Sequence, residues 1–195
     1  MLKKVILFFT RLFFKIFFKI EVKGLKNIPE TGPLIIAANH ISNYDPPAII
    51  AFASIKRKDI YVIAKQELFK NKIFGYFLKK MGAIPIDRSK PQISSIKKSI
   101  EVLNKKNSLL IFPEGTRKKI SNVNNSKDGF AFIASKTYAK IVPTKITIAQ
   151  NNSKLGKIII VFDKPLNLKD YEFYNKKDLR KISKEIMTKI YSLHI

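Results

Sequence analysis

The stretch LIIAANHISNYDP, residues 34–46, joins a continuous apolar run to a short polar segment. Five consecutive apolar residues that follow Gly32 and Pro33 are typical of a strand buried on both faces of a sheet. Open α/β sheets bind their ligands beyond the carboxyl ends of such strands. The stretch therefore predicts an α/β fold in which His40 lies at the ligand-binding edge of the sheet.

Strand and helix patterns alternate along the rest of this 195-residue chain. We expect further strands at 20–24, 60–64, 83–86, 108–112, 141–148 and 157–162, and helices at 46–53, 66–81 with an interruption at Gly75, 93–103, 127–139 and 179–190. This alternation predicts one layered α/β domain with a mostly parallel sheet flanked by helices. Residues 118–126, which are rich in Asn and Ser, are expected to form a loop.

His40 and Asp45 are the candidate catalytic residues. The chain has two histidines, and the other, His194, is the penultimate residue, where a terminus usually frays. An imidazole can take a proton from a hydroxyl, and a carboxylate on its other ring nitrogen fixes the tautomer. The chain has no cysteine, so this base would activate Ser, Thr, water or a substrate hydroxyl. The structural alternative makes Asp45 the N-cap of a helix with Pro46 in its first turn.

The charge of the chain points to an anionic partner. Lys and Arg number 38 against 14 Asp and Glu, which gives a formal net charge of +24. Such an excess favours either nucleic acid or an anionic membrane surface with phosphorylated substrates, although lysines also serve simply as a solvated surface. A metal site is not expected, because the sequence offers two histidines and no cysteine.

Residues 1–20 favour the membrane over nucleic acid. On a helix, Lys4, Arg11, Lys15 and Lys19 form one stripe, and Phe, Leu and Ile side chains cover the remaining surface. Cations interrupt every apolar run before it reaches the about 18 residues that a membrane span needs. We therefore expect an amphipathic interfacial helix at 1–20, followed by a second region at 21–195. The alternative is a helix packed on its own domain.

Two arginines follow expected strands and suggest a phosphate-binding site. Arg88 closes the segment GAIPIDR, and Arg117 closes FPEGTR, in a chain that has only five arginines. Guanidinium binds phosphate through two parallel hydrogen bonds, which Lys does not do. Gly115 would let backbone N–H groups approach an anion. Taken singly, each arginine is better explained by a surface ion pair.

Four segments, in order across residues 24–147, resemble the 1-acylglycerol-3-phosphate acyltransferase family. NHISNYD carries the family's His, Ser and Asp at their expected offsets. GAIPIDR resembles the second segment but departs from it at Pro85, FPEGTR matches the third without departure, and Val142-Pro143 resembles the fourth. AKQEL, with Gly75 after it, looks like the family's segment that follows the second strand. Ser42 would be a turn hydroxyl and not a nucleophile.

The resemblance implies a mechanism and a site. His40 would deprotonate the free hydroxyl of a lysophospholipid, which attacks an acyl thioester of coenzyme A or acyl carrier protein, and Asp45 would orient His40. Arg117, Arg88 and Lys65 would hold the acceptor phosphate. Glu114, Gly115 and Thr116 would help to shape the acceptor site. No cofactor is implied beyond the thioester donor. The expected location is the cytoplasmic face of the cell membrane, as a peripheral or monotopic protein.

Several alternatives stay open at the level of sequence. The same segments fit glycerol-3-phosphate or another lysolipid as the acceptor, so they do not separate these substrates. A noncatalytic basic protein that binds membranes or nucleic acid fits the charge, but it leaves the spacing of His40 and Asp45 unexplained. No nucleic-acid-binding signature is present, and we expect no nucleic acid partner.

Overall fold

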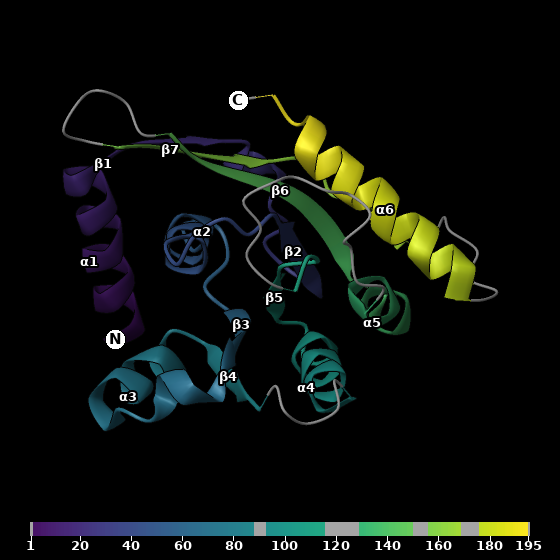
Figure 1. Ribbon diagram of the computed structural model, residues 1–195, viewed down its shortest axis with the longest axis horizontal. Coiled ribbons are helices and arrows are strands. Elements are labelled where there is room, and N and C mark those ends of the chain that lie inside the picture. The colour runs from purple at the N-terminus through teal and green to yellow at the C-terminus, as the bar shows by residue number, and fades with distance from the viewer. Residues whose placement is uncertain (1, 88–92, 116–128, 150–155, 169–175, 195) are drawn as a thin grey trace.

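A seven-stranded sheet organises the part of the chain that the structure describes (Figure 1). The computed structural model describes residues 2–87, 93–115, 129–149, 156–168 and 176–194. The strands are β1 (Phe18–Lys23), β2 (Leu34–Ala38), β3 (Ile60–Lys65), β4 (Ala83–Ile86), β5 (Ser108–Ile111), β6 (Lys140–Ala149) and β7 (Gly156–Phe162). Their order is β1-β7-β6-β2-β5-β3-β4, and only the β6–β7 pair among these described strands is antiparallel. The expected mostly parallel α/β sheet is confirmed.

Strand β2 lies inside the sheet, between β5 and β6, and all its residues are buried. Its register on β5 pairs Ala37 with Ile111. Because the two strands are parallel, the residues three positions further along each chain, His40 and Glu114, emerge at the same edge. The register alone therefore brings together two predicted site residues that are 74 positions apart.

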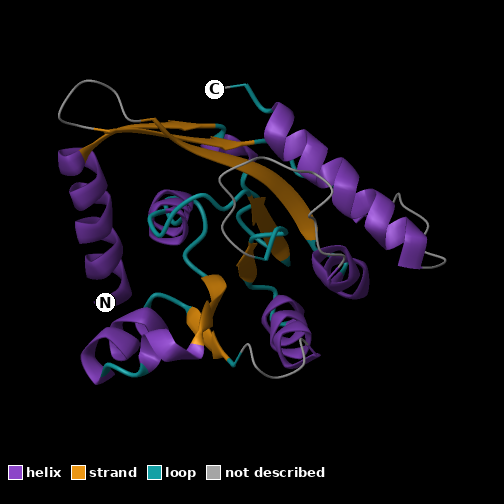
Figure 2. Ribbon diagram, in the orientation of Figure 1, coloured by secondary structure: helices purple, strands orange, loops and turns teal. Residues whose placement is uncertain are grey.

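Helices cover both faces of the sheet (Figure 2). On one face lie α1 (Leu2–Phe17), α2 (Asp45–Ala53) and α3 (Lys72–Lys80), which share one apolar core with Leu34, Ile36 and Ala38 of β2. On the other lie α4 (Ile93–Asn104), α5 (Gly129–Thr137) and α6 (Lys176–Ser192), around Ile35 and Ala37. Alternate residues of β2 thus enter two separate cores, which is why its sequence is apolar without a break.

Two helix predictions need correction. The helix expected over 1–20 ends at Phe17, and the chain continues directly into β1. The helix expected over 66–81 is divided into the 3₁₀ helix η2 (Gln66–Phe69) and α3. Gly75 does not interrupt α3. It lies inside the helix and packs against η2, where a Cβ atom would come within 2.8 Å of the Phe69 carbonyl oxygen.

The N-terminal helix is partly packed and partly exposed. Its side chains Ile6, Leu7 and Phe14 are buried in the core, whereas its other large apolar residues are exposed. The expected stripe of cations is also incomplete, because the Arg11 guanidinium turns inward and donates to the Ala51 carbonyl and the Ser54 hydroxyl at 3.0 Å each. None of the described helices has both the length and the apolar character needed to cross a bilayer. The expected loop at 118–126 lies outside the described residues.

Candidate active site

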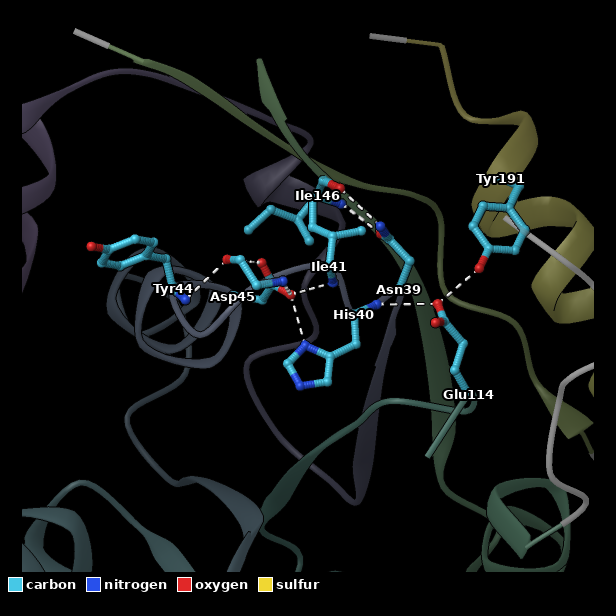
Figure 3. Close-up of polar contacts among 9 residues, drawn as sticks. Asn39, His40, Ile41, Tyr44, Asp45, Glu114, Ile146 and Tyr191 are labelled. Carbon is cyan, nitrogen blue, oxygen red and sulfur yellow. Dashed lines mark hydrogen bonds and ion pairs between the residues drawn. The ribbon is translucent and has the colours of Figure 1, made fainter. Parts of the chain in front are cut away.

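Asn39 fixes the point at which the chain leaves β2. Its side-chain amide donates to the Ile146 carbonyl at 2.9 Å, and its side-chain oxygen accepts from the Ile146 N–H at 2.8 Å. The buried side chain thus continues the pairing with β6 by one more step after the main chain of β2 has turned away. This pair of bonds anchors the start of the turn that carries His40 (Figure 3).

The carboxylate of Asp45 organises this turn from within. Its Oδ2 accepts from the main-chain N–H groups of Ile41 at 2.6 Å and Ser42 at 2.8 Å, and from Nδ1 of His40 at 2.7 Å. Its Oδ1 accepts from the Ser42 hydroxyl at 2.8 Å. These donors offset the desolvation of a fully buried charge. The N-cap alternative is not what the structure shows, because the carboxylate reaches back into the turn and α2 begins at Asp45 itself.

His40 presents one ring nitrogen that is free to act. Because Asp45 offers only acceptor atoms when ionised, Nδ1 donates, and the neutral imidazole then carries its lone pair on Nε2. Figure 3 shows Nε2 directed away from Asp45, and no described residue bonds it. The side chain is 17% exposed. Its ring stacks on Phe112, with centroids 4.2 Å apart and planes at 23°. The ring is therefore held on one side and accessible at the atom that would accept a proton.

Glu114 accepts a hydrogen bond from the main chain of His40. The side chain is buried at the end of β5, where its Oε1 accepts from the His40 main-chain N–H at 3.1 Å and from the Tyr191 hydroxyl at 2.8 Å. The Oε2 atom has no hydrogen-bond partner among the described residues. Burial, together with the bond to Glu114, raises the pKa of Tyr191. Its hydroxyl consequently stays protonated, as a donor, throughout the physiological range of pH.

The structure thus brings together three of the predicted site residues, His40, Asp45 and Glu114. Ser42 is confirmed as a turn hydroxyl, because its oxygen also accepts from the Tyr44 N–H at 3.0 Å. Gly115 has a φ of 71°, which favours glycine, but its own N–H donates to Phe112 within a turn. The backbone N–H of Gly115 is therefore already used within the protein.

The expected phosphate-binding residues are only partly placed. Arg88, Thr116 and Arg117 lie outside the described residues. Lys65 ends β3 and is exposed, and its ammonium makes no hydrogen bond to a described residue. Next to it, a groove of about 560 Å³ runs along the carboxyl ends of β3 and β4, lined by Gln66, Glu67, Phe69, Lys70, Lys79, Pro85, Asp87 and Lys98. Among the described residues, no group of three or more His, Cys, Asp or Glu is placed to hold a metal ion.

Three contributors to the site were missed at the sequence level. Asn39 was recognised within its segment, but nothing in the sequence indicated its bonds to Ile146, which lies 107 positions away. Phe112 is the last residue of an expected strand, so its place at the sheet edge was predictable, although its stacking on His40 was not. Tyr191 had no signal at all, because it lies 77 positions from Glu114 in a helix with an ordinary amphipathic pattern.

Comparison with known proteins gives this geometry a family. A family model described as Acyltransferase matches residues 19–147, which include His40, Asp45 and Glu114. The chain belongs to this acyltransferase family. The resemblance inferred from the ordered sequence segments is therefore confirmed.

Relatives of this chain include two bacterial proteins. The chain is 34% identical to the 1-acyl-sn-glycerol-3-phosphate acyltransferase of Streptococcus pneumoniae, over 82% of this chain and 60% of that protein. It is 33% identical to the Bacillus subtilis protein of the same name, over 82% of this chain and 79% of that one. The chain thus spans less than two thirds of the pneumococcal relative.

A solved structure extends the likeness to nearly the whole acyltransferase chain. The crystal structure of the 1-acyl-sn-glycerophosphate acyltransferase PlsC from Thermotoga maritima has a TM-score of 0.76 at 25% sequence identity. The match covers 99% of this chain and 81% of that one. Helix α1 and Tyr191 of this chain lie outside residues 19–147, to which the match with the family model is limited.

Proposed function

We propose that the protein transfers a fatty acyl group from a thioester to the free hydroxyl of lysophosphatidic acid, which gives phosphatidic acid. The observation that carries the proposal is the 2.7 Å contact between His40 Nδ1 and Asp45 Oδ2, which leaves Nε2 unbonded at the carboxyl edge of the sheet. The pneumococcal and Bacillus subtilis relatives are named for this activity, which supports the same reaction.

The chemistry proceeds without an acyl-enzyme intermediate. Nε2 of His40 takes the proton from the acceptor hydroxyl as its oxygen attacks the thioester carbonyl carbon. The tetrahedral intermediate then collapses, the carbon–sulfur bond breaks, and the imidazolium returns its proton to the leaving thiolate. Asp45 stabilises the imidazolium while it exists, and the two main-chain donors on Oδ2 hold the carboxylate in place.

The acceptor phosphate is assigned to cations beyond the strand ends. Arg117 and Arg88 would bind it through paired hydrogen bonds, with Lys65 as an exposed third cation at the end of β3. Gly115 and Thr116 would complete the same side of the acceptor site. Because Glu114 is buried against the His40 main chain, we assign to it the shaping of the site through His40 and not direct contact with the acceptor.

Helix α1 is proposed as the element that attaches the protein to an anionic membrane. Its outward face carries exposed Phe8, Phe9, Phe13 and Phe17, and its sequence contains no acidic residue. Lys4 and Lys15 are also exposed on this helix. Aromatic insertion combined with lysines at the headgroups is typical of in-plane attachment. We assign this attachment to residues 1–20, with the acyltransferase region at 21–195 and the cytoplasmic face of the cell membrane as its location.

The test is a transfer assay with a choice of substrates. The purified protein is offered lysophosphatidic acid, glycerol-3-phosphate or lysophosphatidylethanolamine as acceptor, each with acyl-coenzyme A and with acyl carrier protein thioester. We expect phosphatidic acid as the main product. Preference for another acceptor would replace the substrate but keep the reaction. Absence of transfer from either donor to any acceptor, by a protein that binds vesicles, would favour the noncatalytic membrane-binding alternative.

A further inference from the structure

Helix α3 has its apolar residues on the outside. Ile73 is 84% exposed, and Phe74, Tyr76 and Phe77 are exposed as well. The position that α3 buries is Gly75. In a helix on the surface of a soluble domain the apolar stripe faces the core and the polar residues face water. Here the arrangement is reversed, and a contiguous apolar surface of this kind marks an interaction site.

The orientation of α3 is set by defined contacts. Asn71 caps the helix, because its side-chain oxygen accepts from the Phe74 N–H at 3.0 Å. Gly75 lies against the main chain of Phe69, and Leu78 packs on the core from the same helix. The inner face of α3 is therefore occupied by a small residue and one aliphatic side chain, which leaves Ile73 and Phe77 on the outer face.

The charges around α3 identify the class of partner. Lys70, Lys72, Lys79 and Lys80 flank the apolar residues and are exposed, and the sequence from 68 to 86 contains no acidic residue. The ammonium of Lys80 lies 5.3 Å from the centre of the Tyr76 ring. An apolar centre with four exposed lysines around it matches an anionic bilayer, in which acyl chains lie beneath phosphate groups, and the nearest acidic residues along the sequence are Glu67 and Asp87. A protein partner would need an acidic rim to match it.

Helix α3 lies on the same face of the sheet as the proposed membrane helix. Ile6 and Leu7 of α1 belong to the core on which Phe69 and Leu78 also pack. We propose that α3 is a second membrane-contacting element, which inserts Ile73 and Phe77 between the headgroups of an anionic leaflet. The inference rests on the proposed function for the presence of a membrane. It adds that the groove beside Lys65, which is lined by Lys70 and Lys79 as well as by Glu67 and Asp87, then lies next to the headgroups.

The absence of tryptophan from this chain makes the test direct. The variant Ile73→Trp has a single tryptophan, whose fluorescence is recorded with vesicles of phosphatidylcholine and phosphatidylglycerol. We expect a blue shift, and quenching by lipids brominated on the acyl chain. The control is Ile93→Trp, at a 62% exposed position on α4, which covers the opposite face of the sheet. Quenching equal to that of the control, in protein that sediments with the vesicles, would overturn the proposal.

A substitution that introduces a charge tests how much Ile73 contributes to vesicle binding. Ile73→Glu should weaken binding to anionic vesicles by about tenfold or more, because the aliphatic side chain that inserts is replaced by a charge. Ile93→Glu should leave vesicle binding unchanged. Both variants keep their fold by circular dichroism, because both positions are exposed. If Ile73→Glu instead converts a lipid-free dimer into a monomer with no change in vesicle binding, the surface is a contact between two copies. Neither readout requires catalysis, so loss of the proposed acyl transfer would not imitate either result.

A second inference comes from separate contacts at the carboxyl end of α6. Lys145 of β6 donates its ammonium to the carbonyl oxygens of Tyr191 at 2.8 Å and Leu193 at 2.7 Å. Lys189 pairs with Asp163 at 3.3 Å. These contacts hold the last turn of α6 against the sheet, so that the Tyr191 hydroxyl meets Glu114 (Figure 3).

We infer that Tyr191 is a positioning residue for the proposed reaction, which it supports through Glu114. The same Glu114 oxygen accepts from both the Tyr191 hydroxyl and the His40 main-chain N–H. The C-terminal helix therefore helps to fix the position of the turn that carries His40. Tyr191 lies beyond residues 19–147, so the match to the family model does not include this contact.

The test is a double-mutant cycle. Tyr191→Phe keeps the ring and removes the hydroxyl, and it should lower kcat by about tenfold with little change in KM, as expected for a hydrogen bond to a charged group. In combination with Glu114→Gln it should add little further loss. Ser192→Ala, on the neighbouring exposed residue, is the control and should retain activity. Full activity of folded Tyr191→Phe, or losses that simply multiply in the double variant, would overturn the inference.

Discussion

The turn that carries His40 and the outer surface of α1 and α3 are built on opposite principles. In the turn, the buried Asp45 carboxylate accepts from neighbouring main-chain and side-chain donors, and Asn39 is doubly bonded to β6. On α1 and α3, large apolar side chains such as Phe9 and Ile73 face outward with lysines around them. The first region is complete by itself, whereas the second would be completed by a partner.

This difference assigns the chemical step to the turn and the binding of lipid to the outer surface. A proton acceptor needs a fixed geometry, which internal hydrogen bonds provide without help from substrate. A lipid acceptor needs to be reached within a membrane, which a rigid interior does not provide. Substitutions in the turn should therefore change the rate of the chemical step, and substitutions on the outer surface should change binding to lipid. The following predictions, in order of expected effect, are designed to test that separation.

The largest effect is expected for His40→Ala. Loss of the general base should lower kcat by about two to four orders of magnitude. The fold should survive, because Asp45 keeps the Ile41 and Ser42 N–H groups as donors. The measurement is acyl transfer under saturating substrate, with the melting temperature as the control for folding. A folded variant with near wild-type turnover would exclude His40 as the base.

Asp45→Asn should be nearly as severe and should also affect stability. The amide no longer selects the tautomer with its proton on Nδ1, so kcat should fall by about two to three orders of magnitude. Replacement of a buried acceptor by a group with donors should lower the free energy of unfolding by about 1–3 kcal/mol. Chemical denaturation measures the second quantity. Retained activity with lowered stability would make Asp45 purely structural.

Adjacent phenylalanines in α1 provide a matched comparison between the buried core and the outer surface. Phe14 is 1% exposed and Phe13 is 42% exposed. Phe14→Ala should lower the free energy of unfolding by about 3–5 kcal/mol through the cavity that it leaves. Phe13→Ala should change stability by less than about 0.5 kcal/mol, but it should weaken binding to anionic vesicles. Equal vesicle binding by wild type and Phe13→Ala would count against α1 as the anchor.

The smallest effect is expected for Ser42→Ala. The Ser42 hydroxyl donates to Asp45 and accepts from the Tyr44 N–H, but it lies outside the path of the proton. Its loss should cost about 1 kcal/mol of positioning, equivalent to roughly a fivefold decrease in kcat. A decrease as large as that of His40→Ala would show that Ser42 takes part in the chemistry, contrary to its place in the turn.

The arginines show that residue type alone does not predict a phosphate contact. The sequence reasoning favoured phosphate contacts for arginines that follow strands. Two others proved to be structural: Arg11 bonds to α2, and Arg57 is buried, where it bonds to Asp59 and to the carbonyl oxygens of Pro29, Gly32 and Lys106. A guanidinium suits carbonyl oxygens as well as phosphate, so the choice between them depends on which groups surround it.

The sequence by itself determined the features that depend on near neighbours. The apolar run 34–38, the positions of His40 and Asp45 on either side of one turn, the mostly parallel sheet and the amphipathic character of α1 were all predictable. Each arises from a periodic pattern or a short spacing, and such patterns record burial and turn geometry within a few residues. The family also followed from them, since its motifs are local.

Only the tertiary structure decided which distant groups meet. The register of β2 on β5 places Glu114 beside the His40 main chain, and the packing of α6 brings Tyr191 to the same carboxylate. The close approach of Gly75 to Phe69 leaves the apolar side chains of α3 on its outer face. No local pattern encodes these contacts, because each depends on how two segments far apart in the chain are aligned when they pack. A shift of one residue in the β2–β5 register would separate His40 from Glu114 without altering a single local signal.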